Sequence, residues 1–282
     1  MIWQVDLAPR PQDSLTSGEI PWGLWICDES GAFRWQTQQP QKAVNGEWLR
    51  QQLQAAIEKT IAFGYSVPRV IQVFRPQIVS LMKIAAEPLG IKVESRRPLL
   101  ALKAWLHQEA QQWTGVPWNP LHIVAQPPQP LPETLQGDRW QFAAISAADI
   151  FPFAESRPIP FRSLPVAWNP LDLGLSSSCP IPGVIIKGGR KSRFLAQWVD
   201  QATPAAVEFI PGSPDGIILH TGLNDRWILA TFEDEAVNAS GQIYQQRLNQ
   251  SRGLHFLMIE PDDSGLTYTG FWLLQRDEAT SP

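Results

Sequence analysis

The most regular pattern in the chain is an apolar repeat at helical spacing over residues 46–63. Apolar side chains recur there every three or four residues, so one face of a helix would be apolar and the other polar. Asn45 is a favourable residue to cap the start of this helix, and Gly64 is a favourable residue to end it. Shorter repeats of the same kind predict two further helices, over residues 76–89 and 98–113.

Short segments rich in aromatic and β-branched residues lie between and before these helices, and they predict strands. The predicted strands are residues 2–10, 22–28, 32–38, 69–74 and 91–95. The resulting order is three strands followed by α-β-α-β-α, which is the element order of ribonuclease-H-like domains. We therefore expect residues 1–113 to form an N-terminal ribonuclease-H-like α/β domain, a mixed sheet with helices on its faces.

The remainder of the chain is predicted to be a second domain behind a Pro-rich linker. Residues 114–137 contain many prolines and no periodicity, which is typical of an extended segment. Residues 138–170 predict one strand and otherwise irregular chain. Further along are predicted helices over 192–202 and 235–250 and a closing hairpin of 254–260 with 268–276. We expect residues 138–282 to form a C-terminal α+β domain, so the chain combines α/β and α+β classes.

Composition narrows the class of protein. Of 282 residues, 44% are hydrophobic and 18% are charged, which is enough apolar side chain for a buried core. With 23 Lys+Arg against 27 Asp+Glu the net charge is −4, so only a local basic patch could attract a polyanion. The two cysteines are far apart and no apolar run is long enough for a membrane span. Because the first residues do not read as a signal peptide, we expect a soluble, cytoplasmic protein.

One local cluster of cations follows two of the predicted strands. Arg75 comes directly after residues 69–74, and Arg96 and Arg97 come directly after residues 91–95. Parallel strands end at the same edge of a sheet, so these three arginines are expected to converge there. Guanidinium groups bind phosphate through paired hydrogen bonds and stack on bases. The arginines are therefore candidate RNA-binding residues.

A second cluster precedes the helix predicted at 192–202. Lys187, Arg190, Lys191 and Arg193 lie within seven residues and would attract phosphate locally in spite of the net negative charge. The alternative interpretation is an ordinary solvated helix end. Exposed aromatic rings beside either cluster could stack on the bases of a single strand, although most of the Trp residues are predicted to be core.

A catalytic function has weaker support in the sequence than RNA binding. A ribonuclease-H-like nuclease would need Asp6 and a carboxylate of the first helix, Glu47 or Glu58, to hold metal ions with a ligand after the fourth strand. That last place holds Arg75, so pairing of Asp6 with Arg75 or with another nearby arginine is the favoured interpretation. The four histidines are isolated, and His255 is predicted to be a hydrogen-bonded strand residue. We therefore expect no catalytic residue, no metal and no cofactor.

Short motifs follow one another in a characteristic order along nearly the whole chain. They include Trp3-x-x-Asp6, Phe74-Arg75, Ser95-Arg96-Arg97, Gly137-x-x-Trp140-x-Phe142, Gly253-Leu254-His255-Phe256-Leu257 and Gly270-Phe271-Trp272-Leu273-Leu274. Each motif is weak alone, but their order and spacing resemble the Tab-two/Atab-two family. The first three motifs contain Arg75, Arg96 and Arg97. No catalytic residue is transferred by the resemblance.

The resemblance implies an RNA-binding protein that acts on translation of photosystem I messages and on photosystem biogenesis, and a start without a transit peptide implies a cyanobacterial member. We expect a non-catalytic protein that binds single-stranded, A/U-rich RNA and supports translation of photosystem genes. The ribosome or photosystem assembly factors are expected as possible further partners. Two alternatives stay open: a divergent metal-dependent nuclease on the N-terminal domain, and a scaffold that docks through the Pro-rich linker and exposed Trp residues.

Overall fold

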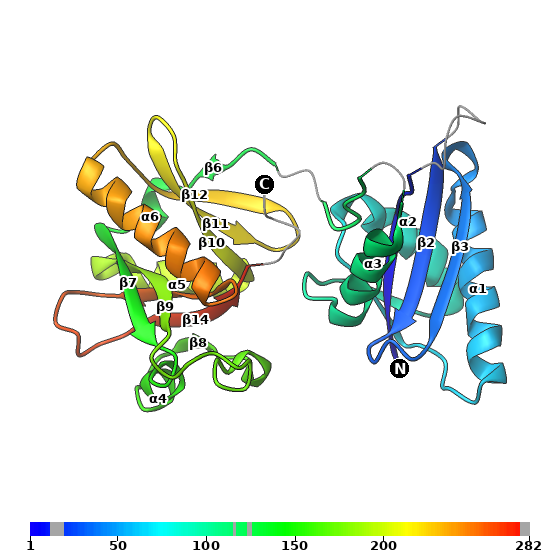
Figure 1. Ribbon diagram of the computed structural model, residues 1–282, viewed down its shortest axis with the longest axis horizontal. Helices are drawn as coiled ribbons and strands as arrows, with labels where there is room; N and C mark the ends of the chain where they lie inside the picture. The colour runs from blue at the N-terminus through cyan, green and yellow to red at the C-terminus, as the bar shows by residue number, and fades with distance from the viewer. Residues whose placement is uncertain (12–19, 115–116, 123–125, 277–282) are drawn as a thin grey trace. The chain divides into compact units, whose positions relative to one another are not determined.

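A computed structural model divides the chain into two units, residues 1–124 and 125–282, which we describe separately (Figure 1). The fold class is mixed α/β with several sheets, as predicted. No described helix is both long and apolar enough to cross a membrane. The residues that the structure describes are 1–11, 20–114, 117–122 and 126–276.

The first unit is built on a five-stranded sheet of order β3-β2-β1-β4-β5. Strand β1 pairs antiparallel with β2 and parallel with β4, so the sheet is mixed. The predicted order of elements is confirmed, and the finer assignment to the ribonuclease-H-like class stays a prediction. The elements are β1 (Ile2–Pro9), β2 (Pro21–Asp28), β3 (Arg34–Pro40), α1 (Gly46–Ala62), β4 (Val70–Val73), α2 (Pro76–Ala86), β5 (Lys92–Ser95) and α3 (Leu100–Gln112).

Local sequence signals explain the ends of these helices. The Asn45 side chain accepts a hydrogen bond of 2.9 Å from the backbone N–H of Trp48, which caps α1 as predicted. Gly64 has φ +79°, a left-handed conformation that favours glycine and stops the helix. Pro76 occupies the first turn of α2, where its missing N–H costs nothing.

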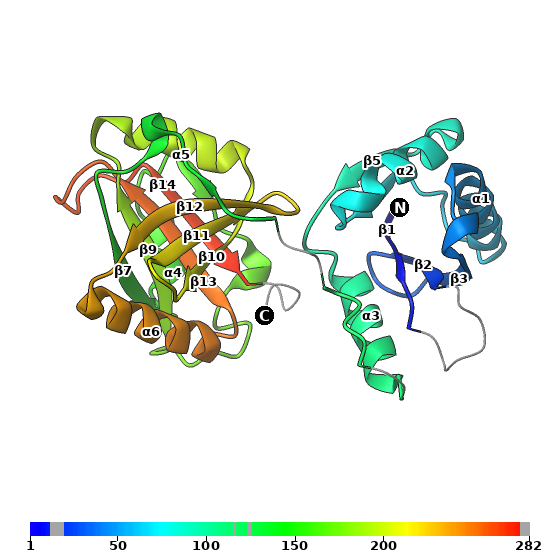
Figure 2. The ribbon, with the colours of Figure 1, turned by 90° about the horizontal axis from the view of Figure 1, so that it is seen from above.

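Strand β1 contributes side chains to both faces of this sheet, because successive side chains of a strand point to opposite sides. Trp3, Val5 and Leu7 pack into one core with apolar residues of α1 and α2. Gln4 lies on the other face, where its side-chain oxygen accepts a hydrogen bond of 2.9 Å from the N–H of Leu102 at the start of α3. Helix α3 therefore covers the face opposite α1 and α2 (Figure 2).

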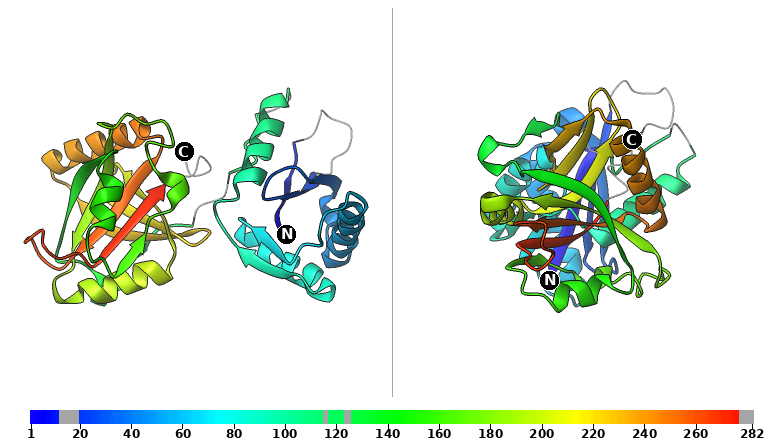
Figure 3. Two further views of the ribbon diagram at one scale, coloured as in Figure 1. Left: turned by 90° about the horizontal axis from the view of Figure 1, so that it is seen from below. Right: turned by 90° about the vertical axis from the view of Figure 1, so that its left-hand side faces the viewer.

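The second unit contains two sheets, of orders β10-β11-β12-β6 and β7-β9-β13-β14-β8. Helices α5 and α6 flank the strands on opposite sides (Figure 2), and the closing hairpin β13–β14 is confirmed (Figure 3, left). The elements are β6 (Gln129–Pro130), β7 (Arg139–Ser146), α4 (Ile150–Glu155), β8 (Phe161–Ser163), β9 (Pro180–Lys187), α5 (Ser192–Gln201), β10 (Pro204–Ile210), β11 (Asp215–Thr221), β12 (Asp225–Phe232), α6 (Glu235–Gln250), β13 (Leu254–Glu260) and β14 (Gly270–Gln275).

Helix α4 and strand β8 were not expected between residues 138 and 170. Helix α4 has six residues, too few to show a helical repeat, and it is held by burial of Ile150 and Ala154 in a core with β9, β13 and β14. Within the segment predicted as a linker, β6 pairs with β12, with Gln129 beside Trp227. The conformations of α4, β6 and β8 therefore depend on packing within the whole unit and not on local propensity.

His255 joins the two sheets of this unit. Its side chain is fully buried on β13, and its Nε2 accepts a hydrogen bond of 2.8 Å from the backbone N–H of Val207 on β10. Its Nδ1 lies 2.8 Å from the carbonyl oxygen of Gly253, to which the neutral ring donates. Burial lowers the pKa of His255 to about 4. The prediction of a hydrogen-bonded strand histidine is confirmed.

Candidate nucleic-acid interface

The ends of β4 and β5 bring the predicted arginines to one edge of the first sheet. The two strands pair in parallel with Val73 beside Ser95, and the N–H of Arg96 donates to the Val73 carbonyl at 2.8 Å. Arg75 and Arg97 follow the same two strand ends, so the chain positions converge as the topology predicts. Their side chains differ in exposure: Arg96 is exposed and Arg97 is half-buried.

Arg75 is held inside the unit by several acceptors at once. Its Nε lies 2.8 Å and 3.0 Å from the two carboxylate oxygens of Asp6, whose side chain is fully buried. Its Nη1 donates to the His122 carbonyl at 2.8 Å, and its Nη2 donates to the Pro120 carbonyl. Burial raises the pKa of Asp6, and the facing guanidinium opposes that effect. The expected pairing of Asp6 with an arginine is confirmed, and the partner is Arg75.

This pairing bears directly on the nuclease hypothesis. Arg75 occupies both carboxylate oxygens of Asp6, which the hypothesis requires as metal ligands. On α1, Glu47 instead bonds Arg50 at 2.6 Å, and Glu58 is exposed. Across the described residues, no group of three or more His, Cys, Asp or Glu is placed to hold a metal ion. The structure therefore does not support a two-metal site on the first sheet.

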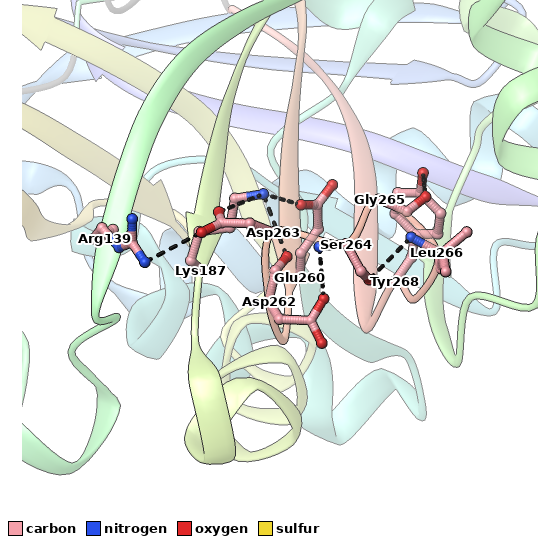
Figure 4. A network of polar contacts seen from close by, with 9 residues as sticks. All are labelled: Arg139, Lys187, Glu260, Asp262, Asp263, Ser264, Gly265, Leu266 and Tyr268. Carbon is pink, nitrogen blue, oxygen red and sulfur yellow. Dashed lines mark hydrogen bonds and ion pairs between the residues drawn. The ribbon is translucent and has the colours of Figure 1, made fainter.

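Lys187 is likewise engaged within its own unit (Figure 4). It ends β9 beside buried Glu260 of β13, and its Nζ bonds the Glu260 carboxylate. Asp263, in the connection to β14, lies 3.5 Å from this ammonium group and 3.2 Å from the guanidinium of Arg139 on β7. Burial lowers the pKa of Lys187, but its acidic partners outweigh burial and the net direction is upward. Lys187 therefore stays charged and paired.

The cations that follow Lys187 lie on the surface. Arg190, Lys191 and Arg193 are exposed around the start of α5. Lys191 donates to the Glu133 carbonyl at 3.1 Å, and within the described residues Arg190 and Arg193 form no ion pair. Phe194 follows them with 70% of its surface exposed. We call Arg190, Lys191, Arg193 and Phe194 the α5 surface.

The predicted site residues thus belong to two separate units, and they differ in whether their charges are paired within the protein or exposed to solvent. Arg75 and Lys187 are neutralised by buried carboxylates, whereas Arg96 and the cations of the α5 surface face solvent. Not one of the thirteen Trp residues, all of them described, is exposed. Among the described residues, the scaffold hypothesis therefore lacks the exposed Trp residues, one of its two docking features, and docking through the Pro-rich linker stays a prediction.

Phe194 is the surface residue that reading the sequence missed. In α5 the buried positions are Leu195, Ala196 and Val199, which define the inner face of the helix. Phe194 falls outside that face, so plotting the residues around a helical wheel would have marked it as an outward-pointing aromatic ring.

Comparison with known families decides the broader assignment. The model described as "RNA-binding protein Tab2/Atab2 N terminal" matches residues 2–109, and that described as "RNA-binding protein Tab2/Atab2, C-terminal domain" matches residues 118–275. The chain belongs to the Tab2/Atab2 family. Arg75, Arg96 and Arg97 lie in the first matched region of this RNA-binding family, and the cations of residues 187–193 lie in the second.

Curated relatives agree with the Tab2/Atab2 assignment. The chain is 27% identical over 282 residues to "Protein TAB2 homolog, chloroplastic" of Zea mays, covering 96% of this chain and 70% of the relative. It is 27% identical over 291 residues to the protein of the same name of Arabidopsis thaliana, covering 96% and 74%. The predicted cyanobacterial origin stays a prediction.

One solved structure, titled "CryoEM structure of simian T-cell lymphotropic virus intasome in complex with PP2A regulatory subunit B56 gamma", is similar over 50% of this chain and 61% of the matched chain. The TM-score is 0.27 and the identity 14%, so this likeness bears on neither fold nor function.

Proposed function

We propose that this protein binds single-stranded, A/U-rich RNA without breaking a bond and thereby supports translation of photosystem genes and photosystem biogenesis. Its membership of an RNA-binding family supports the class of ligand. Relatives named chloroplastic are consistent with a photosynthetic setting. The ribosome or photosystem assembly factors are proposed as further partners, and the cytoplasm as the place of action.

The observation that carries the proposal is the exposure of Arg190, Lys191 and Arg193 together at the start of α5. The protein as a whole has a net charge of −4 and would not attract RNA through its overall field. A dense group of exposed cations creates a local positive potential in which phosphates replace bound counterions. Exposed Arg96 on the first unit is proposed as an additional phosphate contact.

Arg75 and Lys187 receive a different role in this proposal. Each is paired with a buried carboxylate, of Asp6 and Glu260 respectively, so binding phosphate would require breaking an internal ion pair. We propose that these two residues fix the backbone from which Arg96 and the α5 cations project. Half-buried Arg97 is proposed as a secondary contact beside Arg96.

Salt dependence tests the electrostatic part of the proposal. If about five cations contact phosphates of a single strand, the logarithm of the binding constant should fall against the logarithm of salt concentration with a slope of roughly −3 to −4. Reversing both Arg190→Glu and Arg193→Glu should weaken binding and make the slope shallower by about 1.4, since each lost contact removes about 0.7. Fluorescence anisotropy with a short U-rich RNA at several salt concentrations measures both quantities.

The matched control reverses two exposed cations outside both clusters, Lys83→Glu on α2 together with Arg69→Glu before β4. It changes the net charge equally, so a general charge effect would lower its affinity to the same extent. Arg96→Glu, assayed separately, tests the first unit. Wild-type affinity and slope in the Arg190/Arg193 double variant would refute the assignment of RNA contacts to α5.

A further inference from the structure

Nearly all aromatic side chains of the described residues are buried or half-buried, and those that are exposed lie in two places. Phe63 and Tyr65 belong to the connection between α1 and β4, whereas Phe194 lies on α5. Only Phe194 adjoins a group of exposed cations that the proposed function uses. An apolar ring left in water next to positive charges therefore needs an explanation at this one position.

Packing within the unit does not explain the exposure of Phe194. The inner face of α5 is complete without it, because Leu195, Ala196 and Val199 fill the core between the helix and the sheets. The next aromatic residue of the helix, Trp198, is half-buried and contacts Trp227 edge-on with ring centroids 5.3 Å apart. Phe194 has no such ring partner among the described residues.

The exposed cations of the α5 surface lie close to Phe194 along the chain. Residues Gly189–Lys191 form a 3-10 turn that leads directly into α5. Arg190 and Lys191 therefore precede Phe194 by four and three residues, about one turn, and Arg193 precedes it directly; all four side chains are exposed. Three exposed cations thus lie within four residues of one aromatic ring that solvent can reach.

We propose that Phe194 is a base-stacking platform, on which one unpaired base of an RNA strand lies while Arg190, Lys191 and Arg193 hold the adjacent phosphates. This inference rests on the proposed function and adds the reason for a preference for single strands. Bases in a duplex are already stacked on each other, so they cannot lie flat on an external ring. The cations alone would bind single strands and duplexes through their phosphates.

A peptide partner is the competing occupant of an exposed ring. The three surrounding cations favour a polyanion over an apolar peptide, and no acidic side chain of the described residues forms an ion pair with Arg190 or Arg193. A base also needs the flat face of an aromatic ring, whereas an apolar peptide contact needs only apolar area. This difference separates the two occupants experimentally.

The test compares Phe194→Leu, which keeps apolar area but removes the ring, with Phe194→Trp, which keeps a flat aromatic face. Anisotropy titrations use a short U-rich single strand, an abasic ribose-phosphate strand of equal length, and an RNA duplex. For the U-rich strand, Phe194→Leu should weaken binding about 5- to 150-fold, the loss of one stacked base, and Phe194→Trp should bind at least as well as wild type. Binding of the abasic strand and of the duplex should be the same for all three proteins.

Because the ring is 70% exposed, Phe194→Leu should unfold at the wild-type denaturant midpoint, which excludes misfolding as the cause of a loss. If Phe194→Leu binds the U-rich strand like wild type while Arg190→Glu with Arg193→Glu weakens it, the platform is refuted and the proposed function stands. If neither variant changes binding, RNA does not contact α5 and both proposals fail there. An equal loss for the abasic strand would also overturn the stacking inference.

Discussion

Replacing Arg75 with methionine is expected to lower the free energy of unfolding of the first unit by about 3–5 kcal/mol, because it leaves the buried Asp6 carboxylate without its partner. The carbonyl oxygens of Pro120 and His122 lose their donors in the same step. Chemical denaturation followed by circular dichroism measures the loss. Arg96→Met, the same substitution at the neighbouring strand end, is the matched control and should change stability by no more than about 0.5 kcal/mol, since Arg96 is exposed.

Two further measurements separate the ion pair from simple loss of side-chain packing. Asp6→Leu combined with Arg75→Met removes both charges and should recover most of the stability lost in Arg75→Met. In Arg75→Met alone, the pKa of Asp6 is raised further above its unfolded value, so the folded state binds the extra proton. Stability of that variant should therefore increase as the pH falls through the folded pKa. A loss no larger than that of Arg96→Met would contradict the role assigned to the pair.

The second unit is expected to lose about 3 kcal/mol of stability as the pH falls from 6.5 to 4, through the single residue His255. The unfolded chain takes up a proton near pH 6.5, whereas the folded imidazole resists protonation until about pH 4. The stabilisation is therefore complete above pH 6.5 and is lost progressively below it. Protonation would also place a donor at Nε2, which now accepts from Val207.

Unfolding free energies at pH 4 to 7 for wild type and His255→Gln measure this contribution as a difference in slope. The variant is less stable at neutral pH but should lack the His255 part of the decline. Exposed His107 provides the control, and His107→Gln should retain the wild-type slope. Parallel curves for wild type and His255→Gln would show that the folded state accepts the proton as readily as the unfolded chain does.

Periodicity was enough to predict most of the fold. The helix after Asn45 and the hairpin before residue 276 have strong local signals, namely an apolar stripe with caps and alternating strands. The short elements α4 and β8 lack them, because six and three residues are too few for a period to emerge. Their conformations depend on contacts with strands remote in sequence.

The candidate site was predictable to the level of strand topology. Parallel pairing of β4 with β5 is enough to place Arg75 and Arg96 at one edge of the sheet. The order of the strands also predicts that the positive charge of Arg75 lies near Asp6 of β1. The pairing of Lys187 with Glu260 was not predictable, because it depends on the register of β9 against a strand 73 residues away. The four cations of residues 187–193 are close in sequence, but sequence alone does not distinguish Lys187, which is paired with the Glu260 carboxylate, from the three exposed cations.

The two sides of helix α5 have different roles, since the inner side packs in the core and the outer side carries the proposed ligand contacts. Leu195, Ala196 and Val199 anchor the helix in the core, whereas Arg190, Arg193 and Phe194 are exposed and belong to no core cluster. Substitutions at these three exposed positions should therefore change the stability of the unit by no more than about 0.5 kcal/mol each. Ligand preference at this helix is free to diverge between relatives, or to be reprogrammed in the laboratory, while the scaffold stays unchanged.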